Sequence, residues 1–244
     1  MLNILLLSVR YWKKVFYAIV GYLMPASCLS CRALVWSSGG LCCVCWQKCV
    51  FISDLHCFKC GRLARYQGLM CGFCVKEPPF YDSARSLIDF NFVSKRFIHE
   101  LKYSDRTDLI HFFAKLLAST YANFIEDIDI IIPVPMHFFR RIIRSYNQAQ
   151  ILALALADQT KKQFAPFILK KSRFTPTQTS LNRKERKKNL KGSFETYRTE
   201  SLKGKNVLLV DDVMTTGSTV NFCSRALKAS GASCVKVLTI ASVR

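Results

Sequence analysis

Three features are missing from this 244-residue sequence, and each absence excludes a class of protein. No apolar run reaches the roughly 20 uninterrupted residues that a membrane-spanning helix needs, so no transmembrane span is expected. The pattern GxxxxGK[ST], with which P-loop nucleotide hydrolases hold phosphates, does not occur. Near the N-terminus the basic residues follow an apolar run, whereas a secretion signal places them before it, so export is not predicted.

Acidic residues are also scarce: 16 Asp and Glu stand against 36 Lys and Arg, which gives a net charge of +20. Such a charge favours polyanionic partners, whether nucleic acid, an anionic membrane face or phosphorylated substrates, without choosing among them. Residues 161–205 alone hold 14 basic and 3 acidic residues. Basic segments of this kind are usually solvated, but beside a phosphate site they can also close over a polyphosphate.

The N-terminal residues 1–24 are predicted to form an amphipathic helix, because Arg10, Lys13 and Lys14 interrupt the apolar residues. Packing against the rest of the protein is favoured over contact with a membrane surface. We expect a cytoplasmic protein, with the inner face of the membrane as the alternative location. Two domains are predicted to follow, at residues 25–79 and 80–244.

Cysteines dominate the first of these domains. Ten of the twelve lie between residues 28 and 74, and eight form CxxC pairs, with ten residues between the two pairs of each half. A CxxC pair presents two thiolates to one ion, and two pairs complete a tetrahedral site. The spacing therefore predicts tandem zinc ribbons with two structural Zn²⁺ ions, against the alternative of a metal-free cluster. Cys43 and Cys49 lie beside the first site, so a ligand exchange there stays open. The predicted ligands are Cys28, Cys31, Cys42, Cys45, Cys57, Cys60, Cys71 and Cys74.

The rest of the chain has the pattern of an α/β domain with a parallel sheet. Continuous apolar runs at residues 129–135 and 207–210 are typical of strands that are buried on both faces. Apolar residues at helical spacing predict core-facing helices, and shorter alternating runs predict further strands. The expected helices are 94–103, 109–124, 149–159 and 220–230, and the other expected strands are 84–92, 167–169 and 235–241.

Residues 207–220, VLLVDDVMTTGSTV, are the candidate site. Asp211 and Asp212 are expected to follow the strand, and a turn rich in hydroxyl groups then leads into a helix. Backbone N–H groups and the positive end of the helix dipole make such a turn an anion site, with phosphate as the favoured anion. The two carboxylates can accept hydrogen bonds from vicinal sugar hydroxyls or hold Mg²⁺ through water. A Walker B strand is the alternative, but its P-loop partner is missing. The turn residues are Thr215, Thr216, Gly217, Ser218 and Thr219.

This stretch resembles the phosphoribosyl-pyrophosphate (PRPP) signature of type I phosphoribosyltransferases. The resemblance implies that Asp211 and Asp212 bind the ribose hydroxyls, while residues 215–219 hold the 5-phosphate. It also implies a type I phosphoribosyltransferase-like fold for the second domain.

The whole chain from residue 25 onward resembles the ComF family of competence proteins. The likeness rests on the order of its motifs, and one departure is Ser145, where the family usually has glycine. Serine lacks the backbone freedom of glycine at that turn. The motifs are the tandem CxxC pairs, the PRPP signature, residues 98–103, 132–135, 144–148 and 175–178, and Leu181, Arg186, Asn189 and Phe194.

This resemblance implies a role in DNA uptake during natural transformation, and two hypotheses follow. The first is an enzyme that binds PRPP with Mg²⁺ and transfers its ribosyl group to an unidentified nucleophile, through an oxocarbenium-like state. Its catalytic residues would be Asp211, Asp212 and Lys102, with Lys102, Arg144 and Arg186 offered to pyrophosphate.

The alternative is a non-catalytic competence factor that binds single-stranded DNA or docks a helicase or another competence protein. The net charge of +20 motivates it. So do aromatic residues interleaved with arginines, a combination suited to base stacking along a sugar-phosphate track: Phe138, Phe139 and Tyr146.

Overall fold

The computed structural model describes residues 27–28, 30–35, 40–52, 56–62, 68–103, 107–136, 146–172, 192–197 and 199–243. The chain divides into two compact units, Met1–Lys48 and Cys49–Arg244. The predicted helix at residues 1–24 lies outside the described residues, so it stays a prediction. Within the described part of the chain, no helix is both long enough and apolar enough to cross a membrane.

The first unit contains the first cysteine cluster. A tight loop closes where the backbone N–H of Cys28 donates to the carbonyl of Ala33 at 2.6 Å, and an antiparallel bridge joins Ser27 to Leu34. The short helix α2 (Cys43–Gln47) begins at Cys42, whose sulfur accepts a hydrogen bond from the backbone of Cys45. Each CxxC pair is therefore held in a turn by its own backbone.

A five-stranded parallel sheet forms the centre of the second unit, with the strand order β1-β7-β6-β2-β3. The central strands read as continuous apolar runs because both of their faces are covered. All four residues of β2 and residues 207–210 of β6 are buried. This confirms the predicted parallel α/β fold. The strands are β1 (Ser83–Asp89), β2 (Ile130–Pro133), β3 (Gln163–Phe164), β6 (Asn206–Met214) and β7 (Cys234–Ser242).

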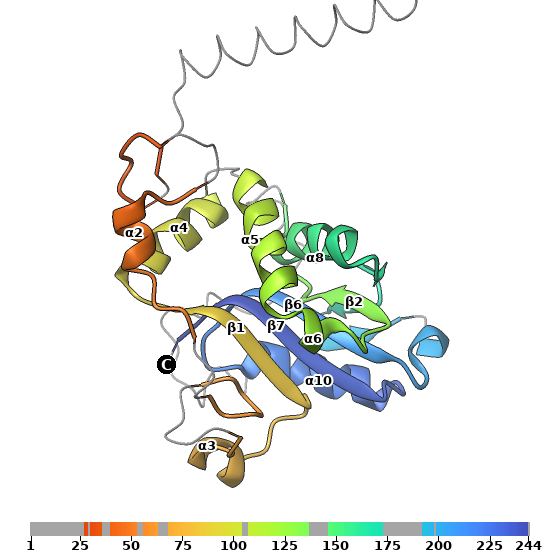
Figure 1. The fold of residues 1–244 in the computed structure, drawn as a ribbon. Helices are drawn as coiled ribbons and strands as arrows, with labels where there is room; N and C mark the ends of the chain where they lie inside the picture. The colour runs from red at the N-terminus through yellow and green to blue at the C-terminus, as the bar shows by residue number, and fades with distance from the viewer. Residues whose placement is uncertain are drawn as a thin grey trace, which may run out of the picture. The chain divides into compact units, whose positions relative to one another are not determined.

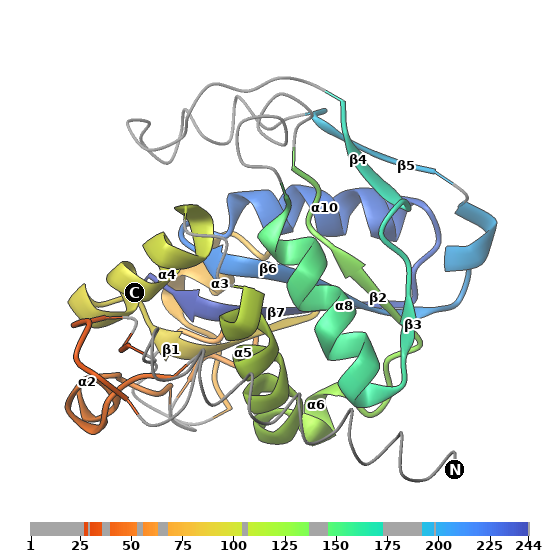
Figure 2. The ribbon, with the colours of Figure 1, turned by 90° about the horizontal axis from the view of Figure 1, so that it is seen from above.

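Helices cover both faces of this sheet. Figure 1 shows α5 (Thr107–Thr120) and α8 (Gln148–Thr160) on one face and α10 (Ser218–Ala229) on the other. Seen from above, α8 runs across β2 and β6 (Figure 2). The other helices among the described residues are α3 (Gly72–Lys76), α4 (Phe92–Tyr103), α6 (Ala122–Ile125) and the 3-10 turn η2 (Thr199–Leu202).

Both edges of the sheet are protected against pairing with another chain. At the β1 edge, the N–H of Ile52 donates to Leu87 at 3.1 Å, and the N–H of Ala84 donates to Lys59, within the second cysteine cluster, at 2.8 Å. At the opposite edge β3 has only two residues. Covering an edge and shortening it both prevent edge-to-edge aggregation.

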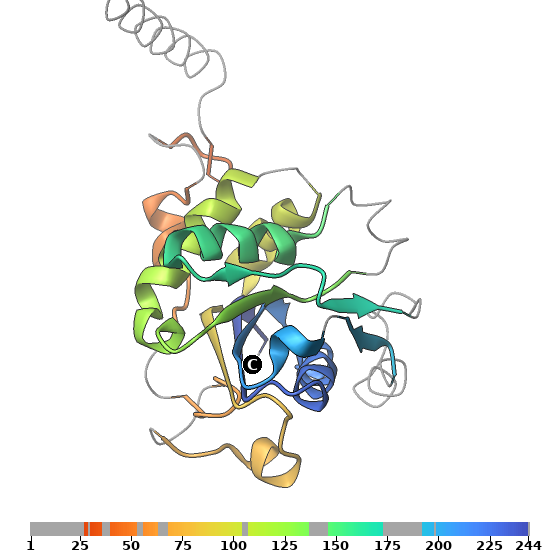
Figure 3. The ribbon, with the colours of Figure 1, turned by 90° about the vertical axis from the view of Figure 1, so that its right-hand side faces the viewer.

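A separate antiparallel pair, β4 (Leu169–Lys171) and β5 (Phe194–Thr196), lies outside the main sheet, as Figures 2 and 3 show. It packs through Leu169 and Phe194 into the core on the α10 side. Residues 173–191, which join the two strands, lie outside the described residues, and they include Arg186.

Most predicted elements are present, with four differences. The strand predicted at 84–92 ends at Asp89, and α4 begins at Phe92. The strand predicted at 167–169 begins at Leu169, and β3 and β5 were not predicted. The helix predicted at 109–124 is two helices, α5 and α6, with Tyr121 between them. The strand predicted to end at Val210 continues to Met214, because β7 pairs with β6 along that whole length.

Candidate functional site

Two groups of four cysteines have the geometry of a metal site. In each group all four Sγ atoms lie within 4.8 Å of one another. Two sulfurs of the first group, Cys31 and Cys42, are 3.6 Å apart, and so are Cys60 and Cys71 of the second. Four thiolates at the usual Zn–S distance of about 2.3 Å form a tetrahedron with edges of about 3.8 Å, so both groups fit Zn²⁺. Their members are Cys28, Cys31, Cys42 and Cys45, and Cys57, Cys60, Cys71 and Cys74.

The backbone around each cluster already favours a thiolate. Burial opposes ionisation of Cys28, but N–H groups of neighbouring residues outweigh it and lower the pKa of this thiol to about 6. The same balance lowers the pKa of Cys57 to about 7. Burial and neighbouring sulfurs instead raise the pKa of Cys45 to about 12, and burial raises that of Cys60 to about 11. A bound Zn²⁺ supplies the charge that keeps such thiols deprotonated.

The hydroxyl-rich turn connects β6 directly to α10. Residues 215–217 reverse the chain, and Gly217 is the N-cap of α10 with a φ of 75°. Only glycine adopts this left-handed conformation without strain. Inside the turn, the hydroxyl groups of Thr216 and Ser218 lie 2.9 Å apart, and the N–H of Ser218 donates to Thr216 Oγ1 at 3.4 Å. The turn therefore places hydroxyl groups and the first N–H groups of a 12-residue helix together.

Asp211 and Asp212 lie within β6 and not after it, which corrects the predicted position. Asp211 Oδ1 accepts the N–H of Asp212 at 2.9 Å, and Asp212 Oδ1 accepts the N–H of Val213 at 2.8 Å. Adjacent side chains of a strand point to opposite faces. Val207 and Leu209 of β6 belong to the same core as Cys223 and Leu227 of α10, so this alternation places Asp211 on the α10 side. Burial raises the pKa of the Cys223 thiol, and the charge of Asp211 raises it further.

These two carboxylates lie beside the point where the strand order reverses. From β2 the chain passes through α8 to β3 in one direction, and from β6 it passes through α10 to β7 in the other, although β2 and β6 are neighbours. Ligands of open α/β sheets bind in the crevice outside the carboxyl ends of the strands at such a switch point. The pairing of β6 with β2 ends at Val210 and Pro133, directly before Asp211.

The β2 side of this switch point is held by the segment that begins α8. The Asn147 amide donates to the carbonyl of Val134 at 3.0 Å, and its oxygen accepts the N–H of Ala149 at 3.2 Å. Tyr146 and Gln148 both donate to the carbonyl of Leu101 in α4, at 3.2 and 3.3 Å. These side chains therefore fix α4 and α8 beside the carboxyl end of β2.

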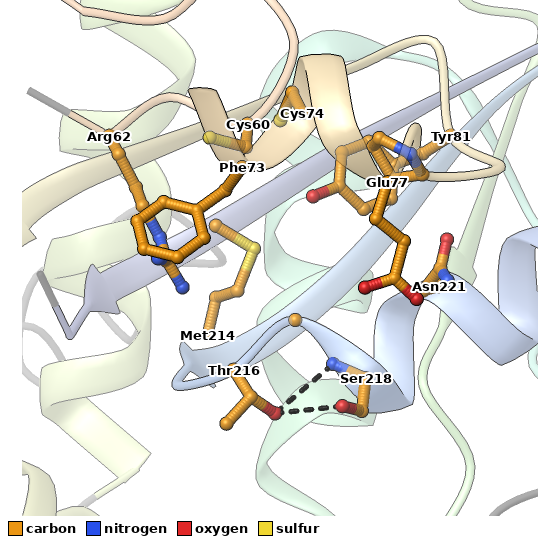
Figure 4. A pocket seen from close by; sticks show the side chains of 12 residues that line it. Cys60, Arg62, Phe73, Cys74, Glu77, Tyr81, Met214, Thr216, Ser218 and Asn221 are labelled. Carbon is orange, nitrogen blue, oxygen red and sulfur yellow. Dashed lines mark hydrogen bonds between the residues drawn. The ribbon is translucent and has the colours of Figure 1, made fainter. Parts of the chain in front are cut away.

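A cavity of about 60 Å³ lies between the turn and the second cysteine cluster. Figure 4 shows Arg62 and Phe73 on one side of it and Glu77, Tyr81 and Asn221 on the other, with Thr216 and Ser218 below. Burial raises the pKa of Tyr81, so its hydroxyl stays protonated.

A larger cavity of about 390 Å³ lies between the carboxyl end of β2, the start of α8 and the β4–β5 pair. Asp211 and Asp212 are outside the described lining of both cavities. The larger one is lined by Pro133, Pro135, Met136, Asn147, Gln150, Pro166, Phe167, Leu169, Lys170, Lys171 and Tyr197.

The three predicted pyrophosphate contacts are not tested by the described residues. Arg144 and Arg186 lie outside the described residues, as do Phe138 and Phe139. Lys102 belongs to α4, but its side chain is not described. Their roles stay predictions. In contrast, Arg62 and Tyr81 border the turn although nothing in their local sequence indicates it, because both contacts form only in the folded chain.

Comparisons with known proteins agree with the two parts of this structure. The double zinc ribbon domain family matches residues 19–75, and the phosphoribosyl transferase domain family matches residues 113–244. The chain is 31% identical to the DNA utilization protein YhgH of Escherichia coli and 30% identical to competence protein F of Haemophilus influenzae. Each alignment covers 88% of this chain and 96% of the relative. Competence protein ComFC of Bacillus subtilis is 26% identical, over 78% and 79% of the two chains.

The two cysteine groups generate a prediction about metal content. We expect the purified protein to hold two zinc ions per chain, one in each group. Cys31→Ser and Cys60→Ser should each leave one, because a group with three thiolates loses affinity while the other group is untouched. Mass spectrometric metal analysis after dialysis measures both numbers, with Cys234→Ser as a control outside the groups. Wild-type protein that holds less than one zinc, with its cysteines reduced, would contradict the assignment.

Proposed function

The chain belongs to the ComF family, which joins a double zinc ribbon to a phosphoribosyltransferase-type domain, and we propose that it binds a 5-phosphorylated ribose during DNA uptake. PRPP with Mg²⁺ is the proposed ligand. The names of the relatives support the proposed role in handling DNA.

The observation that carries this proposal is the placement of the turn. Residues 215–217 lie at the carboxyl end of β6, next to the reversal of strand order, and lead into the N-terminus of α10. A helix N-terminus attracts anions through its N–H groups and its dipole. The hydroxyl groups of Thr216 and Ser218 add hydrogen-bond donors. Together they suit the three terminal oxygens of a phosphate monoester.

Asp211 and Asp212 suit the sugar of the same ligand. Both carboxylates precede the turn by only a few residues on β6, and one oxygen of each is oriented by a backbone N–H. The second oxygen of each can accept a hydrogen bond from a ribose hydroxyl, and an Mg²⁺ ion bound with PRPP would neutralise part of the pyrophosphate charge. Lys102, Arg144 and Arg186 remain the proposed pyrophosphate contacts.

The carboxylates provide the direct test of this ligand. Replacing Asp211 or Asp212 by Asn keeps the shape but removes a charged acceptor, a change worth about 1.5–3 kcal/mol, so PRPP affinity should fall about tenfold or more in each variant. Isothermal calorimetry with PRPP and Mg²⁺ measures the dissociation constants. Asp158→Asn removes the same charge from an exposed position of α8 and should bind like wild type.

Two outcomes of this titration would reject the proposal. The first is wild-type protein that shows no binding heat at millimolar PRPP. The second is a pair of Asn variants that bind PRPP as tightly as Asp158→Asn does.

A second candidate function, binding of single-stranded DNA, is favoured by the 390 Å³ cavity. Its rim carries exposed aromatic rings: Phe167 is 73% exposed and Tyr197 44%. Lys170 Nζ lies 5.6 Å from the centre of the Tyr197 ring. Lysines beside exposed rings suit a strand whose bases stack while its phosphates pair with the charges. The two functions are compatible, because the cavity and the turn are built from different residues.

The cavity predicts how DNA binding should respond to substitution. Phe167→Ala should weaken binding of an oligothymidine about tenfold, because base stacking on an aromatic ring contributes about 1–3 kcal/mol. Replacing both Lys170 and Lys171 by Gln should weaken binding and flatten its salt dependence, since fewer counterions are released. Fluorescence anisotropy across a salt series measures both effects.

Phe92→Ala is the matched control. Phe92 is also exposed, and the Arg96 Cζ atom lies 4.5 Å from the centre of its ring, but Phe92 stands at the start of α4. Equal losses in Phe92→Ala and Phe167→Ala would show that the cavity is not the DNA site.

A further inference from the structure

The two cysteine clusters have the same spacing but different structural surroundings. The first lies in the unit Met1–Lys48. The second lies in the same compact unit as the sheet, and its Cys57, Cys60 and Cys74 belong to the hydrophobic core beneath α10. Tyr81, Met214 and Val220 are members of that same core. Within the described residues, one core therefore joins the second cluster to side chains on both sides of the hydroxyl-rich turn.

The knuckle at residues 57–61 is fixed against β1. Lys59 accepts the N–H of Ala84 at 2.8 Å, and Phe58 accepts the Arg85 guanidinium at 3.0 Å. Gly61 has a φ of 70°, and a Cβ atom at this position would lie 2.5 Å from the Ala84 carbonyl oxygen. The backbone here approaches the sheet as closely as a residue without a side chain permits, so the knuckle cannot shift independently of β1.

From this fixed knuckle, Arg62 reaches the turn. Its Nη2 atom donates to the carbonyl of Thr215 at 3.5 Å, and its Cζ atom lies 5.5 Å from the centre of the Phe73 ring. Phe73 lies between Cys71 and Cys74, two ligands of the same predicted zinc site. The cluster thus positions both Arg62 and the Phe73 ring against which its guanidinium packs.

The segment after the last cysteine holds the other end of the turn. The N–H of Phe80 donates to Asn221 Oδ1 in the first turn of α10 at 2.6 Å. Two residues further on, Asp82 accepts the N–H of Val235 and pairs with Lys228 of α10, both at 2.7 Å. A Cβ atom on Gly217 would lie 3.7 Å from the Tyr81 hydroxyl. Residues 80–82 therefore contact α10 from Asn221 in its first turn to Lys228 near its end.

We propose that the second cysteine cluster, with its zinc, is the support that holds the phosphate turn in its binding conformation, and that Arg62 is its positioning residue. The part of this proposal that concerns ligand binding rests on the proposed function, whereas the part that concerns the conformation of the turn does not. Removing Arg62 leaves the Thr215 carbonyl without this donor and loosens residues 215–218. Among the described residues, the cysteines of the first cluster are not members of the core that contains Met214 and Val220.

Amide hydrogen exchange of the ligand-free protein tests the support directly. We expect peptides covering residues 215–221 to exchange about five to ten times faster in Arg62→Ala than in wild type, and Arg62→Lys to recover most of the protection. Arg96→Ala is the matched control, because the Arg96 Cζ atom also lies over an aromatic ring, 4.5 Å from the centre of Phe92, but both residues belong to α4. Unchanged exchange in Arg62→Ala, or an equal change in Arg96→Ala, would overturn the inference.

PRPP calorimetry on the same proteins separates the two proposals. Arg62→Ala should bind PRPP about five to ten times more weakly while retaining two zinc ions and the wild-type melting temperature. Cys31→Ser, which loses the first site alone, should keep the wild-type affinity. If the turn exchanges faster in Arg62→Ala but the wild-type protein binds no PRPP, the proposed support of the turn is retained and the proposed ligand is rejected.

Discussion

The proposed site depends on one backbone constraint: between Met214, the last residue of β6, and Ser218, the first of α10, the chain must reverse within three residues. It does so through the left-handed conformation of Gly217. Both ends of this turn are held in place, because β6 is paired with β2 and β7 and α10 is packed on the core. The N–H groups at the start of α10 are therefore presented at a fixed place before any ligand arrives, which limits the entropy lost on binding.

The cysteine clusters compensate for segments too small to bury a core of their own, and they do so in two ways. In the first unit the described backbone hydrogen bonds close tight loops around the sulfurs, so a metal bound there would tie these loops together. In the second unit the sulfurs are part of the core beneath α10. There the residues around the predicted metal site also contact β1 and the turn. A structural ion can therefore influence a ligand at the turn without binding it.

Much of this architecture was predictable because strong local patterns agree with the fold. The runs at residues 129–135 and 207–210 predicted central strands, and CxxC spacing predicted both metal groups. The strand status of Asp211 and Asp212 was missed because carboxylates normally end a buried run, whereas pairing with β7 extends β6 through them. The two-residue β3 is too short to show a period. The contact from Arg62 to Thr215 spans 153 residues and leaves no local pattern.

A crystal structure of the protein with ribose 5-phosphate tests the central claim most directly. The phosphate should lie at the start of α10, with its oxygens about 3 Å from the N–H groups of residues 216–219. The ribose hydroxyls should face Asp211 and Asp212. A phosphate bound instead beside Lys170 and Lys171, with the turn vacant, would contradict the account.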